Sequence, residues 1–393
     1  MPKKYSILSF KNFIIVAITI LLISSFLKFL QNRPNHSKTE EKFSIKPSGE
    51  FESINNLILN RKVPKEQKEF AYRNLLGHVQ NIPNASFKPI DVNAPPIREG
   101  RPLKYNPMNP SIQKTDNGYK IICRMTNYIQ TSGKNYRSFD YDDPKGTYRT
   151  KNIFAEYDIS FKKIAQYEVV EELARERIWH NVEGLEDCRL FEKNKSNWFT
   201  CVTLDTSYTG KYAVSLCKLN DQPHDNKIAV ESLLPLISPD PQRPEKNWLP
   251  FVKDDEIFII YSFDPFILYK PNLVTGACET VLQYEPSHDF SKFRGSAAPI
   301  VYEDGYLTLT HELIFPDQRY YVHRLVYLDK NFIVQKISIP FTFRHLGVEF
   351  CCGMTIDHEK KNLLLPIGIE DREIALCIVD LNIINSLLKP LPK

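Results

Sequence analysis

The chain has 393 residues, with 51 lysines and arginines against 47 aspartates and glutamates, a formal net charge of +4. The first 39 residues contain several basic residues and no acidic one, so the rest of the chain is close to neutral. This near balance lacks the basic face or stripe of a nucleic-acid-binding protein, so we expect no nucleic-acid partner. The 27 prolines argue against long helices over much of the chain.

An uncharged apolar segment runs from Phe13 to Leu27 and continues beyond Lys28 to Leu30. Its length favours an uncleaved signal anchor over a signal peptide, which usually has a shorter apolar core and a small-x-small cleavage site. Lysines precede the segment, and the positive-inside rule then leaves the N-terminus in the cytoplasm. We therefore predict a cytoplasmic tail (1–12), a transmembrane helix (13–30) that gives a membrane partner, and a single-pass type II protein of the Golgi or another secretory-pathway membrane.

The residues after this segment are predicted to be luminal. Three acceptor sequons, at Asn35, Asn84 and Asn194, fit that side of the membrane. Residues 31–95 have the composition of a stem, polar at first, then with some helical periodicity and a proline-rich lead-in. We place the domain boundary there, so that 96–393 form the catalytic domain.

From residue 100 the sequence consists of short strand-like segments separated by turn residues, such as Asp254-Asp255 and Asp304-Gly305. One helix is predicted, from Ile164 to Arg177, because charged residues gather on one face. The cysteines show no metal-ligand spacing, and motifs for a P-loop, a serine hydrolase or a zinc protease are missing. The sequence predicts an all-β domain with no metal and no cofactor.

Five polar residues lie inside or beside these predicted strands at intervals of 60 to 64 residues: Arg124, Asp187, Asn247, His311 and Asp371. Five units near 60 residues fill the chain from about residue 100 to its end. Radially repeated four-stranded sheets of a propeller give such a period when their loops are long. The spacing therefore predicts a five-bladed β-propeller with these side chains converging on its axis.

The segment Gly184-Leu185-Glu186-Asp187-Cys188-Arg189 places two adjacent carboxylates near a guanidinium. In an extended strand Asp187 and Arg189 would share one face and Glu186 would take the other. A carboxylate beside a fixed cation stays ionised and oriented, which suits acid–base chemistry in a sugar site. The alternative is a surface salt bridge at the start of a strand, which would contribute little to stability.

The domain resembles the five-bladed β-propeller family of inverting mannoside phosphorylases and the related β-1,2-mannosyltransferases. The resemblance covers roughly residues 105–380 through five motifs in the same order: Asn109-Pro110-Ser111 with Arg124, the Gly184–Arg189 segment, Glu245-Lys246-Asn247-Trp248, Arg294-Gly295-Ser296 with His311 and Tyr321, and Gly368-x-x-Asp371. It implies that Asp187 is the catalytic residue that manages the proton. The other implied residues bind substrate: Asn109, Arg124 and Asp371 at the sugar, Lys246, Arg294, His311 and Tyr321 at the phosphate, and Arg189 and Asn247 beside them.

Three departures from the family pattern bear on the reaction. Cys188 replaces a proline, Lys246 replaces an arginine, and a further arginine has no counterpart in Tyr261-Ser262-Phe263-Asp264. An aspartate near phosphate would repel it, which favours transfer from another donor over phosphorolysis. The resemblance thus implies an inverting mannosyltransferase that uses a nucleotide sugar or a sugar 1-phosphate and a glycan acceptor. A phosphorylase or hydrolase of the same fold, and a non-catalytic glycan-binding propeller, are the alternatives; Trp248 is either core or a sugar platform.

Overall fold

The computed structural model describes residues 49–392, except 101, 132–134, 174–177, 179–180, 206–209, 240–243 and 315–318. The described residues belong to one compact unit, Pro47–Lys393. The predicted membrane segment 13–30 and the sequon at Asn35 lie outside the described residues. Within the described part of the chain, no helix is long and apolar enough to cross a membrane.

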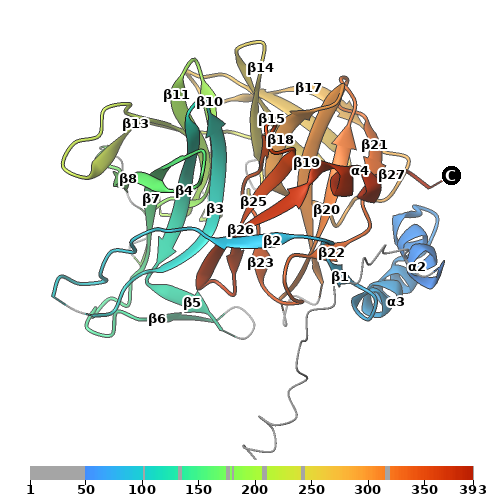
Figure 1. Cartoon of the computed structure of the whole chain (residues 1–393), viewed down its shortest axis with the longest axis horizontal. Helices are drawn as coiled ribbons and strands as arrows, with labels where there is room; N and C mark the ends of the chain where they lie inside the picture. Colours follow the sequence, from blue (N-terminus) through green and yellow to red (C-terminus); the bar gives the residue numbers. More distant parts are fainter. Residues whose placement is uncertain are drawn as a thin grey trace, which may run out of the picture. The chain divides into compact units, whose positions relative to one another are not determined.

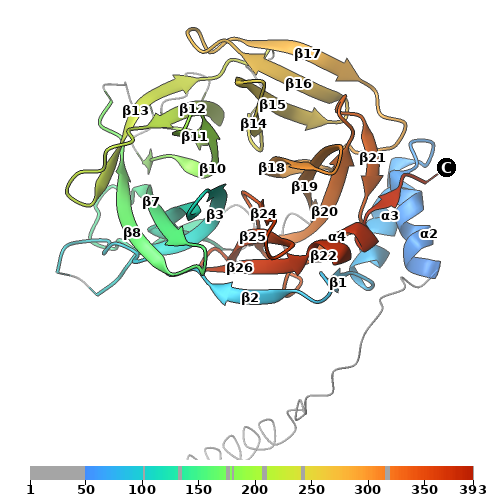
Figure 2. The same ribbon diagram turned by 45° about the horizontal axis from the view of Figure 1, so that its top comes forward.

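The chain is mostly β, as predicted, and its strands follow one another as antiparallel meanders around a central axis (Figure 1 and Figure 2). The first group contains β3 (Asn106–Thr115), β4 (Gly118–Thr126), β7 (Tyr148–Asp158) and β8 (Lys163–Val170); the second β10 (Glu186–Lys193), β11 (Ser196–Thr203), β12 (Ala213–Leu219) and β13 (Lys227–Pro235); the third β14 (Leu249–Lys253), β15 (Glu256–Phe263), β16 (Phe266–Pro271) and β17 (Cys278–Tyr284). The fourth contains β18 (Arg294–Tyr302), β19 (Gly305–Ile314), β20 (Tyr320–Leu328) and β21 (Val334–Ile337); the last β23 (Glu349–Phe350), β24 (Thr355–Asp357), β25 (Asn362–Ile369) and β26 (Glu373–Asp380). Short elements complete the chain: the hairpin β5 (Tyr128–Gln130) and β6 (Tyr136–Ser138), β9 (Val182–Glu183), β22 (Phe341–Thr342), α4 (Leu381–Leu387) and β27 (Lys389–Pro390).

The first strands of neighbouring groups contact one another around the axis, β3 with β10 and β10 with β14. Tight turns join the strands where the sequence predicts them. Asp254 and Asp255 both adopt positive φ (51° and 58°), which is the geometry of a two-residue hairpin turn between β14 and β15. The apolar faces between neighbouring groups form the core, with residues such as Leu309, Leu325 and Leu365 fully buried.

The predicted helix from Ile164 to Arg177 is wrong over its first half. Residues 163–170 form strand β8, which pairs antiparallel with β7 and parallel with residues 227–229 of β13. Backbone pairing on both sides of β8 stabilises the extended conformation against the local charge pattern. Helix propensity is a weak prior, and this tertiary context overrides it.

Residues 49–92 contact the sheets, which differs from a free-standing stem. Helices α2 (Gly49–Leu59) and α3 (Lys65–Leu76) bury Phe51, Ile58 and Leu75 against Ile314 and Val322 of the fourth group. Strand β1 (Gln80–Asn81) then pairs parallel with β22, and β2 (Ser86–Pro89) pairs antiparallel with β26. The last group therefore receives its outer strand from the N-terminal part of the chain, and Figure 2 shows β2 beside β26.

Candidate active site

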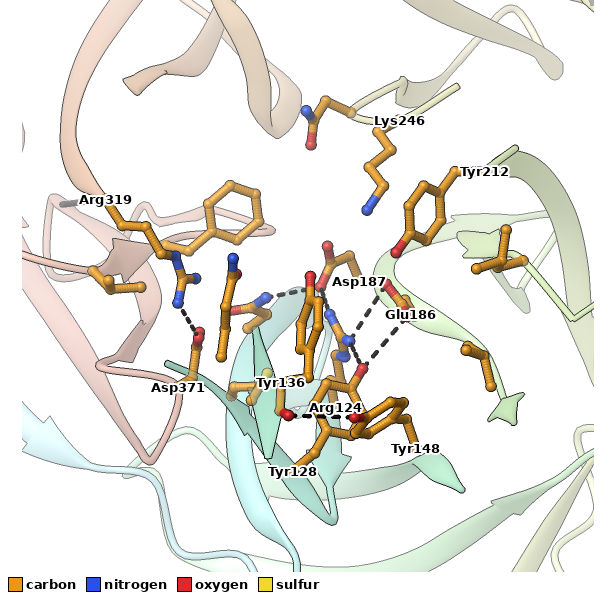
Figure 3. Close-up of a pocket in the computed structure, with 18 of the residues that line it drawn as sticks. Arg124, Tyr128, Tyr136, Tyr148, Glu186, Asp187, Tyr212, Lys246, Arg319 and Asp371 are labelled. Atoms are coloured by element: carbon orange, nitrogen blue, oxygen red, sulfur yellow. Dashed lines mark hydrogen bonds and ion pairs between the residues drawn. The ribbon is translucent and has the colours of Figure 1, made fainter. Parts of the chain in front are cut away.

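Side chains from every group of strands meet in one cavity of about 430 Å³. Its lining includes nine of the ten residues predicted for the site: Asn109, Arg124, Asp187, Lys246, Asn247, Arg294, His311, Tyr321 and Asp371. The tenth, Arg189, does not line the cavity. Figure 3 shows the labelled side chains directed into this space.

The convergence does not come from equivalent positions in the repeat. Asp187 and Asn247 lie at the start of a first strand, whereas Arg124 and His311 lie on second strands and Asp371 follows β25. The interval of 60 to 64 residues therefore mixes different places in the groups, although all five side chains reach the cavity.

Asp187 adopts a left-handed backbone conformation with φ of 50°, inside a β-bulge between β10 and β11. The bulge breaks the alternation of faces, and Glu186 and Asp187 both line the cavity. The prediction that Glu186 faces away from Asp187 is therefore wrong. Gly184, just upstream, has φ of 104° and lies against Thr150 O, so only glycine fits there.

Three more site residues share this backbone conformation: Asn109, Asn247 and Asp371 have φ of 46°, 64° and 53°. Asn and Asp enter the left-handed region more readily than other non-glycine residues. Such conformations gather at functional sites, where the surrounding structure holds them in place. The backbone at these positions aims short polar side chains at the cavity.

The carboxylate of Asp187 accepts two hydrogen bonds at Oδ1, 2.8 Å from Asn109 Nδ2 and 2.7 Å from Arg124 Nη1. Among the described residues, none donates to Oδ2. Burial raises the pKa of Asp187, but the charge of Arg124 and the bond from Asn109 outweigh it, and the pKa lies well below its usual range. Asp187 is therefore a carboxylate at neutral pH in the empty site.

Glu186 shares the same arginine. Its Oε2 lies 3.4 Å from Arg124 Nη2, and its Oε1 accepts from Tyr128 OH at 3.5 Å. Arg124 Nη2 also donates to Tyr128 OH at 2.6 Å. One buried guanidinium thus compensates two buried carboxylates (Figure 3).

Arg189 lies behind the cavity and is 2% exposed. Its guanidinium donates to Ser296 O, Gly295 O and Asp187 O at 3.0, 3.3 and 3.2 Å. These bonds join β10 to β18 and fix the backbone at Asp187. A contact of 3.4 Å to Asn247 Oδ1 orients that amide as well.

Lys246, Arg294 and His311 lie on another side of the cavity. The Lys246 ammonium lies 3.2 Å from the centre of the Tyr212 ring, and burial lowers its pKa. Burial and the nearby His323 and Arg294 lower the pKa of His311 well below its usual range, so its imidazole is neutral. His311 can therefore offer a hydrogen bond to an anion, but not the positive charge expected from the sequence.

Arg319 is a lining residue that sequence reasoning missed. Its Nη1 lies 2.8 Å from Asp371 Oδ2, so the predicted sugar-binding aspartate is paired with a cation of the chain (Figure 3). Arg319 lies in the loop between β19 and β20, and only its place two residues before Tyr321 could have pointed to it.

Three tyrosines form an aromatic wall that was also missed: Tyr128, Tyr136 and Tyr148 have ring centres 5.3 to 5.8 Å apart. Tyr136, from hairpin β5–β6, is 44% exposed and presents its ring to the cavity (Figure 3). An apolar ring with a polar tip suits one face of a sugar. Trp248, by contrast, is 1% exposed and belongs to the core.

Asp264 does not lie at the cavity. Its carboxylate pairs with Arg61 at 2.5 Å and accepts from Phe290 N at 2.9 Å, in the turn between β15 and β16. The expected repulsion of phosphate by Asp264 is therefore wrong. Within the described residues, no group of three or more His, Cys, Asp or Glu side chains could hold a metal ion.

Neither a scan against models of protein families nor a search of curated proteins finds a match to this sequence. Two solved structures are similar in fold. A β-1,2-mannobiose phosphorylase from Listeria innocua is 15% identical with a TM-score of 0.51, over 77% of this chain and 99% of that protein. A protein of Bacteroides thetaiotaomicron described as a glycosidase is 11% identical with a TM-score of 0.51, over 83% and 97% of the two chains. At these identities the likeness is one of fold.

Proposed function

We propose that this chain is an inverting mannosyltransferase that moves mannose from a phosphate-bearing donor to a glycan acceptor, and that its five strand groups are the blades of a β-propeller. One observation carries the proposal: the ionised carboxylate of Asp187 is held by Asn109 and Arg124 in the same cavity as Lys246 and Arg294. The fold shared with the mannobiose phosphorylase supports mannose as the sugar.

Asp187 acts as the base in this scheme. Both of its hydrogen bonds go to Oδ1, which leaves Oδ2 for the proton of the acceptor hydroxyl. As that proton moves to Asp187, the acceptor oxygen forms a bond to the anomeric carbon. The bond from that carbon to the donor oxygen breaks on the opposite face of the sugar, and its electron pair leaves with the phosphate.

The leaving phosphate gains negative charge as this bond breaks. Lys246 and Arg294 supply fixed positive charge for it, and Tyr321 and neutral His311 add hydrogen bonds. Arg319 contributes a further cation beside Asp371. Sugar hydroxyls would bind to Asn109, Arg124 and Asp371, with the Tyr136 ring against one face of the sugar.

We place this reaction in the lumen of the secretory pathway, with the chain as a single-pass type II membrane protein. Support comes from the uncharged segment 13–27 and the lysines that precede it. Asn84 and Asn194 are exposed, so both sequons are open to a glycosyltransferase. Digestion with a glycosidase specific for asparagine-linked glycans tests this placement, because an unchanged electrophoretic mobility would contradict it.

Phosphorolysis is the second candidate, because Asp264 lies away from the cavity and the site keeps its cations. The same proton path then runs in reverse, with Asp187 protonated by the time the glycosidic bond breaks. The low pKa of Asp187 in the empty site favours the direction in which it receives a proton.

The experiment incubates the full chain in detergent with GDP-mannose or mannose 1-phosphate and a panel of mannosyl acceptors. We expect a β-linked product from one donor. Release of mannose 1-phosphate from a mannoside in phosphate buffer would establish phosphorolysis instead. No product under either condition would contradict both proposals.

A further inference from the structure

A buried ion pair lies directly behind the phosphate side of the cavity. Arg324 on β20 and Glu312 on β19 are both fully buried, and Arg324 Nε lies 2.5 Å from Glu312 Oε1. Neither residue lines the cavity. A buried pair persists only when further hydrogen bonds satisfy both ions, so its other partners matter.

Those partners come from the N-terminal helices. Tyr72 OH, on α3, donates to Glu312 Oε2 at 2.5 Å. Asn55 Oδ1, on α2, accepts from Arg324 Nη1 at 2.6 Å. Helices that fall in the predicted stem thus complete a polar network inside the β domain.

This network adjoins two residues assigned to the donor phosphate. His311 precedes Glu312 on β19, and consecutive side chains of a strand point to opposite faces, so His311 faces the cavity while Glu312 faces α3. Arg294 pairs with His311 across β18 and β19. A shift of Glu312 would therefore move both residues.

The loop before Arg294 is held by the same helices. Lys292 Nζ lies 4.4 Å from the centre of the Tyr72 ring, and the Arg324 guanidinium lies 5.3 Å from the Phe293 ring. Lys68 pairs with Asp289, which lies farther along the same loop. Residues 289–294 thus reach the cavity along the surface of α3.

We propose that the helical hairpin α2–α3 positions the donor-phosphate half of the site, with Tyr72 acting on His311 through Glu312 and on Arg294 through Lys292. The assignment of these two residues to the donor rests on the proposed function. Tyr72 touches no substrate in this scheme and is a positioning residue. The hairpin is then part of the catalytic unit, and a passive tether would lack this effect.

The test is Tyr72→Phe in the full chain, which removes the hydroxyl and keeps the ring against Lys292. We expect the KM for GDP-mannose to rise about fivefold or more, since couplings of this kind span roughly 5–150-fold. The KM for the acceptor should stay within about twofold, because Asp187 and the tyrosine wall are untouched. Phe70→Ala is the matched control, because Phe70 lies on the same helix and is 66% exposed.

An unchanged donor KM in Tyr72→Phe, even with a lower melting temperature, would overturn the proposal. Amide hydrogen exchange supplies a readout that needs no turnover. Peptides covering 292–297 and 309–313 should exchange faster in Tyr72→Phe than in Phe70→Ala. If the wild type uses none of the donors, the proposed function fails, while equal exchange in the two variants would separately refute the positioning role.

Discussion

Arg124 Nη1 lies 2.7 Å from Asp187 Oδ1, and both side chains are largely withdrawn from solvent. The same guanidinium lies 3.4 Å from Glu186, so one cation balances two carboxylates that are adjacent in the sequence. Removing the cation leaves two negative charges in a confined space, which is far more costly than losing an exposed ion pair. The stability and the chemistry of the site therefore depend on the same contact.

Arg124→Gln should lower the free energy of unfolding by about 3–5 kcal/mol, the usual cost of breaking a buried ion pair from one side. Denaturant titration measures this change. In the double variant Arg124→Gln, Asp187→Asn the loss should be smaller than the sum of the two single losses, because one uncompensated charge is gone. Additive losses would contradict the coupling.

Asp187→Asn should lower kcat by about 10²–10⁴-fold, because the amide keeps the shape of the side chain but cannot accept the proton. Initial rates with saturating donor and acceptor measure this. Asp225→Asn is the control, since its carboxylate is 83% exposed and far from the cavity lining. A near-normal rate in Asp187→Asn would assign the proton to another group, with Glu186 the first to examine.

Acid should destabilise the wild type in a way that depends on Asp187. Its pKa is depressed in the folded chain relative to the unfolded value of about 3.9. The stabilisation is therefore complete above pH 5 or so, and it is lost as pH falls through the folded pKa. Melting temperatures between about pH 3 and pH 7 should drop less steeply for Asp187→Asn than for the wild type. Parallel curves would argue against a depressed pKa.

Lys246→Arg should extend activity to higher pH. Burial lowers the pKa of Lys246, so rising pH removes its charge earlier than that of an exposed lysine. Arginine stays protonated, so the alkaline fall in kcat/KM for the donor should shift to higher pH. An alkaline limb at the same pH in both proteins would place the titrating group elsewhere.

Trp248→Ala separates the core from the sugar platform. The side chain is 1% exposed, and its Nε1 donates to Glu245 at 3.2 Å. The free energy of unfolding should fall by about 3–5 kcal/mol, as for other buried aromatics. At a temperature where the variant is folded, the KM for the acceptor should match that of the wild type. A raised KM with unchanged stability would show that the ring contacts sugar.

Most of the site could be predicted because its polar residues are spaced through the whole domain and follow a known order. The side chains that sequence reasoning misplaced depend on local backbone geometry. The bulge at Asp187 turns Glu186 into the cavity, and no alternation rule anticipates that turn. Arg319 and the tyrosine wall come from loops whose paths are set by the fold, so their spacing carries no signal.

The fold was predicted at the level of strands and turns, whose residues carry strong local preferences. Strand β8 and the helices α2 and α3 were misjudged for one shared reason. Their positions depend on partners far along the chain, β13 for β8 and Glu312 with Arg324 for the helices. Local composition records such partners poorly, so a polar periodic segment read as helix or stem.

The pairing of β2 with β26 has a consequence for biosynthesis. Strand β2 leaves the ribosome early, while its partner β26 is among the last segments to be made. Until then β2 has unsatisfied backbone groups, and the last group has an open edge that another chain could pair with. The ring can close only after translation is nearly finished, so nascent and prematurely terminated chains carry two exposed edges that chaperones have to shield.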